Sequence, residues 1–169
     1  DIQKHISDPD IPDLGCVLKA LGSKTHWLIE LKPYGLLTKK QKEKALRQIK
    51  TMMNRYNINQ RAFILSFDRE LLALGVSLFP GTRFVLNMNR PYPANKRTEN
   101  ILKKFYAVCV KQKNLNEKFV TFNHRLGKPV MTFVCNDRKS LDKCLSWGVD
   151  VIMTDRPKWA REYILGQKE

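Results

Sequence analysis

Short apolar segments alternate with amphipathic segments along most of the chain, and this alternation restricts the fold more than any other feature of the sequence. The amphipathic segments carry apolar residues at helical spacing, whereas the short apolar runs are typical of strands. Regular alternation of this kind predicts a parallel sheet, and nearly continuous apolar strands predict that both of its faces are covered. Six strands are expected, at Trp27–Lys32, Ala62–Ser66, Arg83–Met88, Phe119–Phe122, Val130–Val134 and Val149–Met153.

The expected helices have recognisable ends. Thr38 followed by Gln41 three residues later is a capping-box signature at the start of a helix that runs to about Tyr56. Asp137 is placed to cap a later helix, and Gly148 suits the position just after that helix ends. Further helices are expected near residues 14–21, 68–74 and 98–111, and after Pro157.

The length of 169 residues suits one α/β domain. The candidate architectures are a doubly wound sheet and a (β/α) barrel of the TIM type. Neither a G-x-G-x-x-G motif nor a P-loop follows any expected strand, so nothing supports a nucleotide-binding sheet. The longest apolar run, Leu71–Phe79, is much shorter than the ~18 residues that a membrane span requires.

The formal net charge of +15 predicts attraction to polyanions, phosphate esters or anionic membranes. The basic face of the helix that starts at Lys39 and the pairs Lys96–Arg97 and Lys103–Lys104 are the candidates for nucleic acid or membrane binding. These residues are scattered over several elements and are not interleaved with aromatic residues, so a nucleic-acid partner is the least favoured, and a solvated surface is expected.

The four cysteines at positions 16, 109, 135 and 144 form no C-x-x-C pair. Neither a zinc ribbon nor a thioredoxin motif is therefore supported. We expect four partly buried free thiols. The sequence leaves the cellular compartment open.

Functional side chains of a barrel lie at the carboxyl ends of its strands. This rule selects Glu30 and Lys32, which are two residues apart and so point to the same face, together with Ser66, Asn136 and Asp155. In one interpretation Glu30 ligates Mg²⁺ or Ca²⁺ and Lys32 neutralises an anionic oxygen. In the other, the two residues form a local ion pair at a strand end. Spacing alone leaves both interpretations open.

Five segments, in order from residue 11 to residue 157, resemble motifs of one enzyme family. Ile29–Lys32 matches I-E-L/I-K, Ser66–Asp68 matches S-F-D, and Gly148–Pro157 follows G-V-D-G-I-I-T-D-R-P closely. Weaker matches join Ile11–Leu14 to I-P-T-L and Thr132–Asn136 to W-T-V-N. The chain thus resembles the carboxyl-terminal two-thirds of a glycerophosphodiester phosphodiesterase, a metal-dependent TIM-barrel enzyme.

The resemblance implies metal-dependent hydrolysis of glycerophosphodiesters to glycerol 3-phosphate and an alcohol. Glu30 would be a ligand of a divalent metal, Mg²⁺ or Ca²⁺, and Lys32 would bind the phosphate of the substrate. The expected partner is a glycerophosphodiester or a phospholipid headgroup. In the family, two histidines act as general acid and base or nucleophile.

The family's H-R-G, E-x-D and H-D motifs should precede the segment that starts at Ile11, where this sequence has only ten residues. No catalytic residue is therefore assigned. His5 and His26 have unsuitable surroundings, and His124, just after an expected strand, has the most suitable position although a surface or packing role is favoured.

A TIM barrel usually needs about 250 residues and eight strands, and six strands are expected in this chain. Residues 1–169 are therefore expected to form an incomplete domain in which the first two strands are apparently missing. An amino-terminal segment or a second copy would complete the barrel. The alternative is a catalytically inactive relative that binds phosphate or lipid headgroups without cleaving them.

Overall fold

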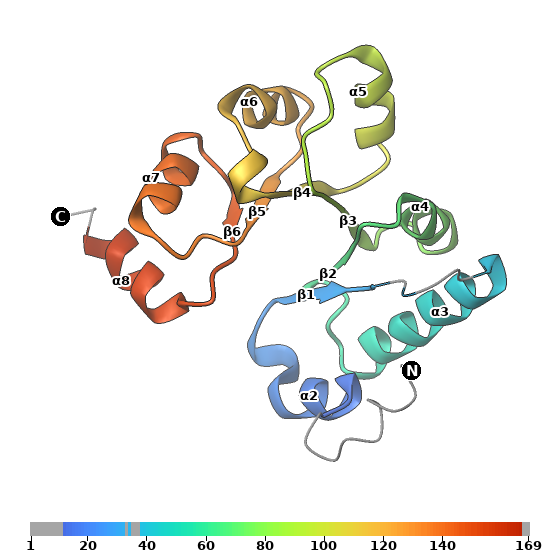
Figure 1. Cartoon of the computed structure of the whole chain (residues 1–169). Coiled ribbons are helices and arrows are strands. Elements are labelled where there is room, and N and C mark those ends of the chain that lie inside the picture. The colour runs from blue at the N-terminus through green and yellow to red at the C-terminus, as the bar shows by residue number, and fades with distance from the viewer. Residues whose placement is uncertain (1–11, 33, 35–37, 167–169) are drawn as a thin grey trace.

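The computed structural model describes residues 12–32, 34 and 38–166, and it contains one curved sheet of six parallel strands. Figure 1 shows the strands as an arc at the centre with the helices outside it. Neighbours along the chain are neighbours in the sheet, in the order β1 to β6. The predicted α/β architecture, a TIM-type barrel of which six strands are present, is confirmed. The strands are β1 (Trp27–Glu30), β2 (Ala62–Ser66), β3 (Arg83–Met88), β4 (Ala107–Lys111), β5 (Val130–Phe133) and β6 (Val151–Ile152).

Local chemistry fixes several helix ends where the sequence places them. Both halves of the predicted capping box are present, since the Thr38 hydroxyl accepts from the Gln41 N–H and the Thr38 N–H donates to Gln41 Oε1. Asp137 accepts from the Ser140 N–H, and Gly148 has a φ of 73°. The helices are α2 (Leu14–Leu21), α3 (Lys39–Arg55), α4 (Arg69–Leu78), α5 (Lys96–Leu102), α6 (Glu117–Arg125), α7 (Arg138–Ser146) and α8 (Pro157–Gly166), with 3₁₀ turns at Gly22–Lys24 and Gln112–Asn114.

The region between α5 and α6 corrects two predictions. The expected strand Phe119–Phe122 is part of α6, which Asn116 starts by accepting from the Phe119 N–H. The expected helix over residues 98–111 ends at Leu102, and Ala107–Lys111 forms β4. The predicted total of six strands was right only because a missed strand balanced a false one. Short apolar runs fit either a strand or a helix, and at Phe119–Phe122 the Asn116 cap favours the helix.

Apolar side chains pack on both faces of the sheet. The outer face, beneath the helices, carries the larger cluster, which includes Leu46, Leu72 and Phe84. The inner face carries a smaller cluster that consists of Leu65, Val85, Ala107, Cys109 and Met131. The inner cluster therefore lines the interior of the partial barrel.

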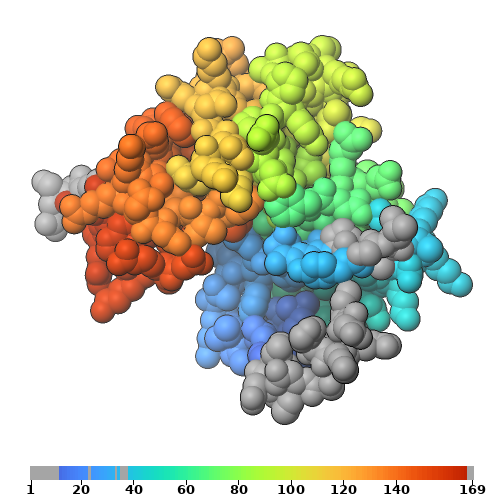
Figure 2. Space-filling model, viewed as in Figure 1, coloured from blue at the N-terminus to red at the C-terminus, as the bar shows by residue number. Residues whose placement is uncertain are grey.

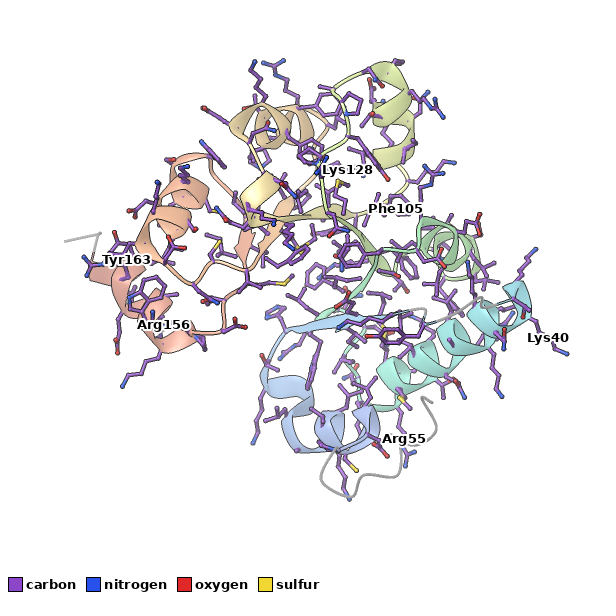
Figure 3. All side chains as sticks on the ribbon, viewed as in Figure 1. Lys40, Arg55, Phe105, Lys128, Arg156 and Tyr163 are labelled. Carbon is purple, nitrogen blue, oxygen red and sulfur yellow. The ribbon has the colours of Figure 1, made fainter. Side chains whose placement is uncertain are left out.

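Two further sets of contacts stabilise the layer outside the sheet. Lys128 extends its ammonium to the backbone oxygens of Phe105, at 2.7 Å, and Lys103, at 3.3 Å (Figure 3). Just before α8, the guanidinium of Arg156 lies over the ring of Trp159 on that helix, and this ring stacks on Tyr163. Within the described residues, none of the helices combines the length and the apolar character that crossing a membrane requires.

The first and last described helices, α2 and α8, lie at opposite ends of the arc of helices (Figure 1). Figure 2 shows the surface indented between the blue segment around α2 and the red segment around α8. In the part of the chain that the structure describes, β1 pairs only with β2 and β6 only with β5. The two outer strands therefore present unpaired edges.

Candidate functional site

Glu30 is the last residue of β1 and lies at the carboxyl end of the barrel. Ile29 packs into the outer core, so its neighbours Leu28 and Glu30 face inward. Lys32 Nζ lies 3.8 Å from Glu30 Oε2, and the two side chains are 57% and 32% exposed. The prediction that these two side chains share a face is confirmed. The ion pair is present, and a solvent-exposed pair of this length contributes little to stability by itself.

Asn87, on β3, is the functional candidate that the sequence analysis missed. Its Nδ2 donates to Glu30 Oε1 over 3.4 Å, and the residue is only 6% exposed. Its Oδ1 is buried and has no hydrogen-bond partner among the described residues. A buried acceptor without a partner costs roughly 1–3 kcal/mol and calls for an explanation. The available signal was an amide side chain inside an otherwise apolar expected strand.

A cavity of about 310 Å³ lies at this end of the barrel. Phe67 and Phe133 meet edge to face in its wall, with ring centres 6.0 Å apart. A mostly apolar cavity with a few polar groups is typical of small-molecule sites. The polar lining is Glu30, Asn87, Thr154 and Asp155, and the rest is Leu28, Leu65, Phe67, Cys109, Phe133, Val134 and Met153.

Cys109 lies beside Asn87 in the β3–β4 register, on the inner face. Burial raises the pKa of the Cys109 thiol to about 12, and the negative charge of Glu30 acts in the same direction. The thiol therefore stays protonated at neutral pH. A nucleophilic role for Cys109 is not supported, because the thiolate is the reactive form.

Asn136 and Asp155, two of the residues expected at strand ends, are brought together. Asn136 Nδ2 donates to Asp155 Oδ2 at 2.7 Å, while Asn136 Oδ1 accepts from the Asp155 N–H and the Thr154 hydroxyl. Asn136 thereby joins the loop after β5 to the loop after β6. Ser66 does not join the site, because its buried hydroxyl donates to the Leu31 backbone oxygen at 2.7 Å.

The two histidines that the structure describes, His26 and His124, do not reach this end of the barrel. His124 lies on α6, and its Nε2 contacts Asp150 Oδ2 at 2.9 Å. The same carboxylate oxygen accepts from the N–H of Val130, the first residue of β5, so His124 is at the opposite end from Glu30. His26 precedes β1 and lies at that opposite end as well. The predictions on His5 and Ile11 lie outside the described residues.

The described residues supply only part of a metal site. They contain no group of three or more His, Cys, Asp or Glu side chains that could hold an ion. The Glu30 carboxylate and the unpartnered Asn87 Oδ1 are oxygen donors of the kind that Mg²⁺ and Ca²⁺ prefer, but these ions take six or more ligands. These oxygen donors are of the right chemical type for Mg²⁺ or Ca²⁺. They are too few to hold either ion without ligands from other residues.

Comparison with known proteins identifies one protein family. A family model described as the glycerophosphoryl diester phosphodiesterase family matches residues 2–159. None of the curated proteins compared with the chain matches it.

Similar solved structures include a protein of Silicibacter pomeroyi assigned as a glycerophosphoryl diester phosphodiesterase, with a TM-score of 0.83 and 19% identity over 93% of this chain and 57% of that chain. A glycerophosphodiester phosphodiesterase of Parabacteroides distasonis has a TM-score of 0.81 and 20% identity over 94% of this chain and 66% of that chain. A phosphodiesterase of Oleispira antarctica, in complex with the product sn-glycerol-3-phosphate, has a TM-score of 0.76 and 19% identity over 91% of this chain and 61% of that chain. These similarities establish the fold, and the chain spans less than two-thirds of each of the three structures.

Proposed function

The chain belongs to the glycerophosphoryl diester phosphodiesterase family, and on that premise we propose that it takes part in the hydrolysis of glycerophosphodiesters to glycerol 3-phosphate and an alcohol. The observation that carries the proposal is that Glu30 lines a cavity at the carboxyl end of the barrel, with the Lys32 ammonium 3.8 Å from its carboxylate. Active sites of TIM barrels lie at this end. An anionic diester would meet a lysine there, and the substrate would be a free glycerophosphodiester or a phospholipid headgroup.

Lys32 is proposed to bind the phosphate. Its side chain is 57% exposed, so the ammonium can leave Glu30 and turn toward a ligand at little cost. Binding would replace a weak ion pair by a charge-assisted hydrogen bond to a phosphate oxygen.

Glu30 is proposed as one ligand of a divalent metal, Mg²⁺ or Ca²⁺. When bound, such an ion polarises the phosphate and stabilises the charge that develops in the transition state. The hydrogen bond from Asn87 would orient the Glu30 carboxylate toward the cavity. Further ligands would have to come from residues other than those described.

The partner that completes the barrel is proposed to be an amino-terminal segment or a second copy of the chain. The unpaired edges of β1 and β6 support this, because folded proteins avoid exposing such edges. The 169 residues would then be an incomplete form of the domain. The general acid and base would come from the same complementing part.

A second candidate function is binding without cleavage. It is favoured by the positions of His26 and His124, because both lie at the end of the barrel opposite the cavity. Lys32 and the cavity would then hold a phosphate or headgroup that is not hydrolysed.

A calorimetric titration of the completed barrel, the chain together with its complementing part, with glycerophosphocholine in the presence of Mg²⁺ or Ca²⁺ tests both functions when it is combined with an assay for released glycerol 3-phosphate. Binding that Glu30→Gln and Lys32→Gln each weaken at least tenfold, with release of product, supports hydrolysis. The same binding without product supports the second candidate. Lys143→Gln, a change of an exposed lysine on α7, is the matched control. Absence of both binding and product would overturn the assignment for this chain.

A further inference from the structure

Cys135 and Cys144 form a buried pair of thiols that the proposed function does not use. Cys135 follows β5, Cys144 lies on α7, and their Sγ atoms are 3.6 Å apart. Both residues are fully buried and both are free thiols. The two remaining cysteines differ, since Cys16 is exposed on α2 and Cys109 lies on the inner face of the sheet.

The backbone on each side of the pair is held in place. The Cys135 N–H donates to the Met153 oxygen at 2.9 Å, and the Cys144 oxygen accepts from the Val149 N–H at 3.0 Å. The sulfurs must approach by only about 1.5 Å to reach the bonded distance of about 2.05 Å. Rotation of the two side chains can supply a movement of that size.

The two sulfurs have unequal acidity. The hydrogen bond shared with Cys135 lowers the pKa of the Cys144 thiol, although burial opposes this. The same hydrogen bond, together with burial, raises the pKa of Cys135. Cys144 is therefore the sulfur that ionises first and attacks an electrophile, because the thiolate is the nucleophile.

We propose that Cys135 and Cys144 are an oxidation site, at which a hydroperoxide converts the two thiols to an intramolecular disulfide. The Cys144 thiolate attacks one peroxide oxygen, the O–O bond breaks, and a sulfenic acid and hydroxide form, the hydroxide taking a proton to leave as water. The Cys135 thiol then loses its proton and its sulfur attacks the sulfenic sulfur, so that the S–S bond forms and a second water leaves. Two thiols and one hydrogen peroxide thus give one disulfide and two waters.

The site is close enough to the surface for a small oxidant. α7 is a surface helix on which Asp142, Lys143 and Ser146 are exposed, and Cys144 faces the core beneath it. The pair thus lies one layer below solvent, and a local opening of α7 would admit a molecule of the size of hydrogen peroxide.

The disulfide would act on the loop that carries Asn136. Asn136 is the next residue after Cys135, and it holds Asp155 and Thr154 at the carboxyl end of the barrel. Tying this loop covalently to α7 would fix the junction between the loops after β5 and β6. The proposal does not depend on catalysis, so it stands or falls separately from the proposed function.

Peptide mapping of the full chain after exposure to hydrogen peroxide tests the site. Reduced protein is oxidised, its remaining thiols are blocked with N-ethylmaleimide in denaturant, and it is digested with trypsin without reduction. Arg138, Lys139 and Lys143 separate the two cysteines, so a disulfide appears as two joined peptides. We expect this joined species, and we expect it to disappear after treatment with dithiothreitol.

Variants and a stability measurement make the result specific. Cys16→Ser and Cys109→Ser are expected to keep the joined species, whereas Cys144→Ser and Cys144→Ala should each abolish it. Oxidation should raise the thermal midpoint of the wild-type chain by about 5 °C, as expected when a short loop is closed. Recovery of Cys135 and Cys144 as blocked thiols while Cys16 is oxidised would overturn the proposal. So would sulfinic acid at either position in place of the disulfide.

Discussion

The side-chain amide of Asn87 on β3 donates to Glu30 Oε1 on β1 at 3.4 Å, so two strands that are not neighbours in the sheet meet through polar atoms inside the barrel. The strand between them contributes the apolar Leu65 to the same inner face. The contact satisfies one end of the amide and leaves Oδ1 buried without a partner. A leucine would fill this position at no such cost, so the polar residue does not serve packing.

Two substitutions of Asn87 should distinguish the effect of packing on the free energy of unfolding from the effect of polarity. Asn87→Leu removes the unpartnered oxygen and is expected to leave the free energy of unfolding unchanged or raise it by about 1 kcal/mol. Asn87→Asp places a second carboxylate beside Glu30 and should lower it by about 2 kcal/mol or more at pH 7, with a smaller loss near pH 4. Urea unfolding at the two pH values measures both changes. A stabilised Asp variant would contradict the geometry.

Gly75, on α4, lies against the ring of Phe84 on β3. A Cβ atom at this glycine would be 2.5 Å from Phe84 Cε1 and Cζ, and Phe84 is only 2% exposed. Gly75→Ala is therefore expected to lower the free energy of unfolding by about 1–3 kcal/mol, because a filled core accepts extra atoms poorly. Gly166→Ala, where a Cβ atom meets nothing within 4 Å, is the control and should change it by less than about 0.5 kcal/mol. Equal stability of the two variants would refute the close approach.

Local signals predicted the elements that local chemistry fixes. The Thr38–Gln41 capping box, the Asp137 cap and the positive φ of Gly148 involve residues a few positions apart, and all three are confirmed. Glu30 and Lys32 lie close together as strand alternation predicts, although β1 ends at Glu30, two residues earlier than the predicted strand.

Long-range contacts were beyond the sequence analysis. The Asn87–Glu30 hydrogen bond joins residues 57 positions apart and depends on how the sheet curves. The basic face of α3 was expected to be solvated, yet the Lys42 side chain is only 13% exposed because it reaches Asp68 on the loop before α4. The sequence favours His124 by its position only if Phe119–Phe122 is a strand, and these residues belong to α6 instead.

Lys128 should be a structural lysine. Its ammonium donates to the backbone oxygens of Phe105 and Lys103, and burial lowers its pKa. Lys128→Met leaves the Phe105 oxygen without its donor and is expected to lower the free energy of unfolding by about 1–3 kcal/mol at pH 7. Lys118→Met, at an exposed position on α6, is the control and should change it by less than about 0.5 kcal/mol. Chemical denaturation measures both, and equal effects would show that the two backbone contacts contribute nothing.

Lys42 and Asp68 should make the stability of the fold depend on pH at both extremes. Their charged atoms are 2.6 Å apart and both side chains are mostly buried. Burial opposes ionisation of Asp68, but hydrogen bonds from Lys42 and from the N–H groups of Leu71 and Glu70 outweigh it and hold the pKa of Asp68 below its usual 3.8. The hydrogen bond to Asp68 holds the pKa of Lys42 above its usual 10.5.

The signs of these shifts define the pH window of the pair. The contribution of Asp68 is complete above its usual pKa and is lost as the pH falls through the lower folded value, while that of Lys42 is complete below 10.5 and is lost as the pH rises through the higher folded value. Asp68→Asn should therefore cost about 2 kcal/mol between about pH 5 and pH 9, and less at either extreme. Glu43→Gln, which breaks the exposed pair with Arg47, should cost less than about 0.5 kcal/mol throughout. Urea unfolding of both variants across this range checks the prediction, and a pH-independent loss in Asp68→Asn would assign the effect to the helix cap instead of the ion pair.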